Sequence, residues 1–110
     1  MNPWILLVLA GVFEIGWPVG LKMSQAPGVT ITGVFTGIGV AVVFMGISGF
    51  MLWTAQKEIP IGTAYAIWTG IGAAGTFILG IFIYGDSVNL MKILAVALII
   101  GGVALLKLAH

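Results

Sequence analysis

The sequence predicts an all-α integral membrane protein with four transmembrane helices in a single domain over residues 1–110. Hydrophobic residues make up 61% of the chain and charged residues only 6%, whereas about a quarter of an ordinary soluble domain is charged. The apolar residues fall into four segments, each close to the roughly 20 residues that a helix needs to cross a bilayer. Lipid, rather than water, is therefore the expected solvent for most of the surface.

The first two segments are separated by a loop rich in helix breakers. The first segment spans residues 3–21, and the run Lys-Met-Ser-Gln-Ala-Pro-Gly follows it at positions 22–28. Serine, proline and glycine are typical of turns and loops, so we expect the chain to reverse direction here. The second segment then spans residues 31–55.

The third and fourth segments follow short polar turns. A turn at residues 56–58 precedes the third segment, 60–84, whose first residue is Pro60. Proline is tolerated there because the first turn of a helix has no intrahelical partner for its N–H groups. A second turn, at residues 85–89, leads into the fourth segment at residues 90–107.

The composition excludes several classes of function. Cysteine is absent, and the single histidine is the last residue, His110, which we expect to be solvated. We therefore expect no metal site, haem or other cofactor within the membrane. Three acidic residues and a terminal histidine supply no set of nucleophile, base and orienting group, so we do not expect an enzyme. The net charge of +1 offers no basic surface for nucleic acid.

The four lysines bear on how the helices insert. Lys22 and Lys92 flank the first and third loops on one side of the membrane, and Lys57 and Lys107 lie on the other side. An excess of lysine and arginine in cytoplasmic loops normally sets the orientation, and two against two gives no preference. We therefore expect insertion both ways round and an antiparallel pair of identical subunits.

Glu14 is the strongest candidate for a functional residue. It lies near the middle of the first segment, where an ionised side chain costs about 3 kcal/mol or more and usually marks an ion or substrate path. The alternative is a protonated carboxyl group that only packs and forms hydrogen bonds. Glu58 and Asp86 lie in predicted turns, where we expect solvated surface charges.

Helical spacing places a small residue and an aromatic residue beside Glu14. Gly11 and Trp17 lie three residues before and after it on the same helix face, which predicts a pocket at the carboxylate. Pro18 has no N–H to donate to the carbonyl of Glu14, so we also expect a local kink.

Residues from two other segments are candidates for the same site. Tyr65 and Trp68 are three apart and can both face inward, although both residue types also form belts at the membrane interface. Ser48 lies deep in its segment, where its hydroxyl can donate to the Glu14 carboxylate or bond back to its own helix. A carboxylate among aromatic rings suits a cation. Guanidinium fits well because it can donate two parallel hydrogen bonds, whereas a quaternary ammonium ion has no donors.

The residues around Glu14 and in the third segment resemble a known family. Three runs look like the small multidrug resistance family: Gly-Val-Phe-Glu-Ile-Gly-Trp at 11–17, Leu-Lys at 21–22, and Pro-Ile-Gly-Thr-Ala-Tyr-Ala-Ile-Trp-Thr-Gly-Ile-Gly-Ala at 60–73. The match covers essentially the whole chain. Trp17, three residues after the glutamate, and the run Trp-Thr-Gly-Ile-Gly-Ala resemble the guanidinium exporter subtype of that family.

The resemblance implies a proton-coupled antiporter of the bacterial plasma membrane. Its fold would be a dual-topology, antiparallel homodimer that exchanges a guanidinium ion for protons by alternating access. Glu14 of both subunits would bind protons or substrate in competition, in a substrate-binding surround formed by Gly11, Trp17, Ser48, Tyr65 and Trp68. Two departures stand out. Pro18 occupies a position where a small residue is more usual, and the stretch between Lys22 and Pro60 is longer than usual, so the first loop or second helix is expected to differ.

Three alternatives stay open. The chain can be a broader exporter of quaternary ammonium or aromatic cations within the same family, or one subunit of a heterodimeric transporter. From a different class, it can be a non-transporting membrane anchor or assembly subunit. Such a subunit needs no ionisable group at mid-depth and often supplies histidines for haem, so Glu14 and the lack of an internal histidine argue against it.

Overall fold

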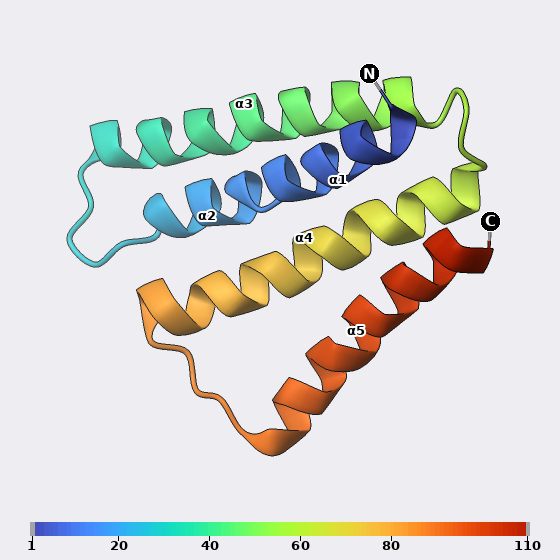
Figure 1. Ribbon diagram of the computed structural model, residues 1–110. Helices are drawn as coiled ribbons and strands as arrows, with labels where there is room; N and C mark the ends of the chain where they lie inside the picture. Colours follow the sequence, from blue (N-terminus) through green and yellow to red (C-terminus); the bar gives the residue numbers. More distant parts are fainter. Residues whose placement is uncertain (1, 110) are drawn as a thin grey trace.

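The computed structural model describes residues 2–109, and within them five helices form four spans (Figure 1). The helices are α1 (Pro3–Glu14), α2 (Gly16–Met23), α3 (Ile31–Ala55), α4 (Ile61–Tyr84) and α5 (Leu90–Ala109). α1 and α2 together make one span, and all four spans are long and apolar enough to cross a membrane. The predicted all-α, four-span fold class is confirmed. His110, which we expect to be solvated, lies outside the described residues.

Turn chemistry sets where the helices begin and end. The side chains of Asn2 and Thr30 accept hydrogen bonds from backbone N–H groups in the first turns of α1 and α3, at 2.8 and 3.1 Å. α4 begins directly after Pro60. It ends at Tyr84 and is capped by Gly85, whose φ of 68° lies in the left-handed region that glycine adopts without steric cost.

The first span is interrupted at Ile15, in agreement with the kink predicted from Pro18. α1 ends at Glu14 and α2 begins at Gly16. Pro18 cannot donate to the carbonyl of Glu14, and the next N–H, that of Val19, reaches the Ile15 carbonyl only at 3.5 Å. The break therefore follows directly after the carboxylate that the sequence singles out.

Glycine allows the closest helix crossing. α3 packs along both α1 and α2, and α1 also packs against α4. Where α2 crosses α3, a Cβ added to Gly20 would lie 2.7 Å from the carbonyl oxygen of Gly37, and one added to Gly37 would lie 2.6 Å from the carbonyl oxygen of Gly20. The two backbones touch here, as small residues permit between helices in lipid.

The buried core lies at one end of the bundle, and the other end is open. The core consists of seven side chains from α1, α3, α4 and the turn after α3: Leu7, Ala10, Ala55, Ile59, Ala64, Ile67 and Trp68. At the opposite end α2 and α4 share no substantial contact, and Figure 1 shows them running apart. This divergence leaves room for a cleft between the first and third spans.

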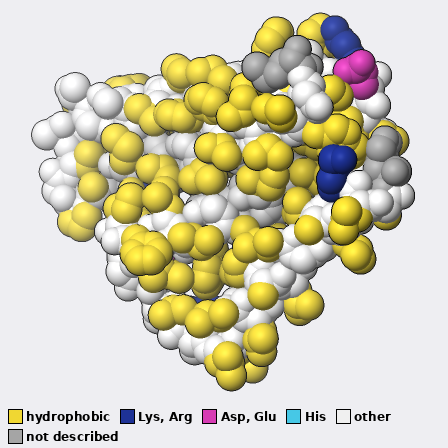
Figure 2. All heavy atoms as spheres, viewed as in Figure 1, with side chains coloured by type: hydrophobic (Ala, Val, Ile, Leu, Met, Phe, Trp, Pro, Cys, Tyr) yellow, Lys and Arg dark blue, Asp and Glu magenta, His cyan; other side chains and the backbone are white. Residues whose placement is uncertain are grey.

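The outside of the molecule is apolar. Large hydrophobic side chains cover much of the visible surface in Figure 2, as expected for a protein that faces lipid. α5 packs mainly on α4, and none of its described residues is buried. The first three spans therefore form the core and the cleft, and α5 lies against their outside.

Candidate functional site

Glu14 has one carboxylate oxygen held by the protein and one free. The indole N–H of Trp17 donates to Oε1 at 2.7 Å, across one turn of the interrupted span. Oε2 is buried, and within residues 2–109 no hydrogen-bond donor reaches it. A buried, unpaired acceptor is costly unless a ligand or a proton satisfies it. Glu14 and Trp17 thus meet as the sequence spacing predicts.

A cleft of about 450 Å³ opens beside this carboxylate, between the first span and α4. Its lining residues are Glu14, Trp17 and Pro18 on one wall and Thr69, Gly72, Ala73, Thr76 and Phe77 on the other. Among the described residues that line it, Glu14 alone carries a charge. Because the walls are mostly apolar, the field of the carboxylate is weakly screened inside the cleft.

Two glycines set the approach of α1 to α4 around Glu14. A Cβ added to Gly72 would lie 2.5 Å from Cγ of Glu14, so α4 can carry no larger residue at that point without displacing the carboxylate. A Cβ added to Gly11 would lie 2.7 Å from two side-chain carbons of Ile71. Gly11, expected from the sequence as a site residue, therefore lies at the contact between the two helices that carry the cleft.

Ser48 has different partners from the two that the sequence offered. Its hydroxyl donates neither to the Glu14 carboxylate nor to its own helix, but to the carbonyl of Ala10 at 2.6 Å. It also accepts the indole N–H of Trp68 at 2.8 Å. Ser48 is fully buried, so this network joins three spans one turn away from Glu14 and leaves the carboxylate to Trp17.

Tyr65 and Trp68 do not both turn inward. Their rings are in contact, with centroids 5.6 Å apart, but Trp68 is buried in the core while Tyr65 is 57% exposed. Neither residue lines the cleft at Glu14 within this chain. Within this single chain Tyr65 is therefore exposed on α4, and its place in the binding site stays a prediction.

Sequence reasoning missed the α4 wall of the cleft. Thr69, Thr76 and Phe77 lie there, and the sequence prediction included none of them. The sequence did contain an indication of Thr76, since it lies two turns after Trp68, with Gly72 between them on the same helix face. Only the divergence of α2 from α4 shows that this face borders an open space.

The arrangement suits the binding of a monovalent cation or a proton. One carboxylate with a free oxygen can accept hydrogen bonds from a positively charged donor, and Trp17 offers an aromatic ring beside it. Among residues 2–109 there is no group of three or more histidine, cysteine, aspartate or glutamate side chains that would hold a metal ion.

Fold and cleft together define a small multi-pass membrane protein with an acidic group inside one of its spans. The sequence pattern of the Small Multidrug Resistance protein matches residues 2–99. The chain belongs to the small multidrug resistance family, and the predicted resemblance is confirmed.

Several curated relatives match over almost their whole length. A guanidinium exporter of Proteus vulgaris is 49% identical over 107 residues, which cover 96% of this chain and 97% of the relative. A guanidinium exporter of Yersinia pseudotuberculosis is 47% identical over 106 residues, with 96% and 97% covered. A guanidinium exporter of Escherichia coli K12 is 44% identical over 106 residues, with 96% of both chains covered.

Proposed function

We propose that this protein exports guanidinium and small guanidinyl compounds across the bacterial plasma membrane in exchange for protons. The relatives described above are guanidinium exporters, and the similarity covers nearly the full length of this chain. The observation that carries the proposal is the state of Glu14, whose Oε1 is held by Trp17 while Oε2 is buried without a partner. A cation with several N–H donors satisfies that oxygen directly.

Guanidinium matches this carboxylate better than a quaternary ammonium ion does. It is planar, weakly hydrated and rich in donors, so it can bond Oε2 while its face lies against the Trp17 ring. A quaternary ammonium ion brings no donor and would leave Oε2 unsatisfied. The cleft therefore favours binding of a cation that donates hydrogen bonds over a cation of similar size that has no donors.

Proton coupling follows from the use of one group by two ligands. A carboxylate that carries a proton has lost the charge that attracts a cation, so proton and substrate exclude each other at Glu14. If only the loaded forms change conformation, the inward flow of protons drives the cation outward. In this scheme Trp17, Gly11 and Gly72 position the carboxylate, and the Ser48 network with Trp68 holds the helix turn beneath it.

The test is proton flux from purified protein in liposomes on addition of guanidinium and, separately, of tetramethylammonium. We expect guanidinium to drive proton movement and tetramethylammonium to give the signal of empty liposomes. Equal responses to both ions would mean that the protein is a broader cation exporter and not a selective guanidinium exporter. Silence with a folded protein would point to a missing partner subunit or a non-transporting membrane protein and would refute the proposal.

We further propose that two copies assemble as an antiparallel homodimer with dual topology. The helices carry Lys22 and Lys92 near one end of the bundle and Lys57 and Lys107 near the other, so charge favours neither orientation. Each orientation of the chain would then supply one Glu14 to a shared site.

Dual topology predicts partial labelling of any single loop. Because the chain has no cysteine, Gln25→Cys places one thiol in the exposed loop after α2. In intact cells, about half of these thiols should react with a membrane-impermeant maleimide, since neither orientation is preferred. Complete labelling, or none until the membrane is permeabilised, would contradict dual topology.

A further inference from the structure

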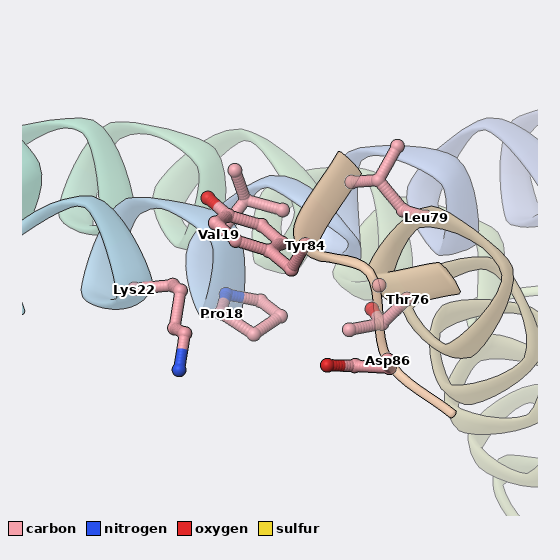
Figure 3. Close-up of a pocket in the computed structure, with 8 residues that line it drawn as sticks. Pro18, Val19, Lys22, Thr76, Leu79, Tyr84 and Asp86 are labelled. Atoms are coloured by element: carbon pink, nitrogen blue, oxygen red, sulfur yellow. The ribbon is translucent and has the colours of Figure 1, made fainter. Parts of the chain in front are cut away.

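A second, smaller cavity of about 180 Å³ adjoins the Glu14 cleft. Figure 3 shows residues that line this outer cavity. The two cavities share Pro18 and Thr76 in their linings. The outer cavity is also lined by Lys22 and Asp86, which are exposed at the ends of their spans. The two adjoining cavities therefore extend from the loop ends of α2 and α4 toward Glu14.

Thr76 stands where the two cavities meet. Figure 3 shows it on the α4 wall of the outer cavity, near Asp86, with Pro18 and Lys22 on the α2 side. A cation that moved between Asp86 and Glu14 through these two cavities would pass this position. Among the described lining residues, those shared by both cavities are Pro18, which has no side-chain polar group, and Thr76, which has a hydroxyl.

The Thr76 hydroxyl forms no hydrogen bond to its own helix, unlike those of Thr36, Thr54 and Thr69. A threonine inside an apolar helix normally donates to a carbonyl one turn back. Thr69 donates to the carbonyl of Tyr65 at 2.8 Å, and Thr36 donates to the carbonyl of Thr32 at 2.8 Å. Within residues 2–109, Thr76 forms no such bond, so its hydroxyl remains available to a ligand.

We propose that Thr76 is a substrate-binding residue whose hydroxyl oxygen accepts an N–H of a guanidinium-type cation between the outer cavity and Glu14. This inference rests on the proposed function. The hydroxyl replaces part of the water that the cation loses on leaving the membrane surface, and no charge is added that would hold the cation too tightly to leave. An ion without donors gains nothing from this oxygen.

The test compares guanidinium transport by three variants with that of the wild type in liposomes. Thr76→Val removes the hydroxyl and keeps the branched shape, while Thr76→Ser keeps the hydroxyl. The matched control is Thr36→Val, because Thr36 is exposed on α3, outside both cavities, and its hydroxyl is already bonded to its own helix. Folding of each variant is checked by its elution as a single species in detergent.

We expect Thr76→Val to raise the KM for guanidinium about tenfold with little change in kcat, as for the loss of one hydrogen bond to a charged group. Thr76→Ser should restore a KM close to that of the wild type, and Thr36→Val should leave KM unchanged. A wild-type KM in folded Thr76→Val, or an equal defect in Thr76→Ser, would overturn the role of Thr76 while leaving the proposed function intact. A wild type that does not respond to guanidinium would overturn both.

Discussion

Glu14→Gln is expected to reduce guanidinium-driven proton flux in liposomes to the level of protein-free vesicles. The glutamine side chain has nearly the same shape, and its carbonyl oxygen can still accept the indole N–H of Trp17, which now donates at 2.7 Å. What the variant loses is the negative charge and the ability to take up and release a proton. Both halves of the exchange cycle depend on that charge, so the expected effect is a complete loss rather than a change in affinity.

The matched control is Glu58→Gln, which removes the same charge elsewhere. Glu58 is exposed in the turn between α3 and α4 and does not line the cleft. This variant should transport like the wild type. If Glu14→Gln retained uptake driven by a pH gradient, Glu14 would not be the shared proton and substrate site, and the coupling mechanism would have to be assigned to another group.

Among glycine-to-alanine substitutions in the interior of α3, Gly37→Ala is expected to destabilise the fold the most. The added Cβ would lie 2.6 Å from both the Gly20 carbonyl oxygen and the Ser24 backbone nitrogen. These are backbone atoms, which cannot rotate away as a side chain can. Overpacking of this kind costs about 1–3 kcal/mol, and it should appear as a lower midpoint of thermal unfolding in detergent.

Gly39→Ala supplies the comparison in the same helix. Apart from its chain neighbours and the nearby backbone of its own helix, a Cβ added to Gly39 meets no described atom within 4 Å. Alanine is also the better helix former, so this variant should unfold at the same temperature as the wild type or slightly higher. Equal losses of stability in the two variants would mean that the contact between α2 and α3 is not the cause.

The four spans were predictable because the bilayer imposes a strong and simple rule on sequence. A helix in lipid must bond all its own backbone groups and must be about 20 residues long, and breaker-rich loops mark its ends. The break after Glu14 was predictable for a similar reason, since Pro18 lacks an N–H wherever the helix lies. The Glu14–Trp17 contact depends on spacing within one helix, which the sequence contains directly.

Contacts between spans were harder to predict, because spacing shows which residues share a face but not what that face meets. Ser48 could be placed at mid-depth, yet its acceptor on Ala10 and its donor Trp68 belong to two other helices. Thr76 was missed for the same reason. Its importance arises only because α2 and α4 separate at that level, and the angle between two helices is not recorded in the sequence of either one.

The position of α5 has a consequence for how this sequence can change over evolutionary time. None of its described residues is buried, and only Val103 and Leu106 among them pack against the core, so an apolar substitution elsewhere in α5 should alter the stability of the other three spans very little. Substitution is not tolerated in this way at Gly20, Gly37 and Gly72, because a Cβ added to any of them would lie less than 3 Å from other atoms of the chain. Selection for stability therefore acts mainly on the first three spans. The fourth is left open to selection by whatever it meets outside the chain.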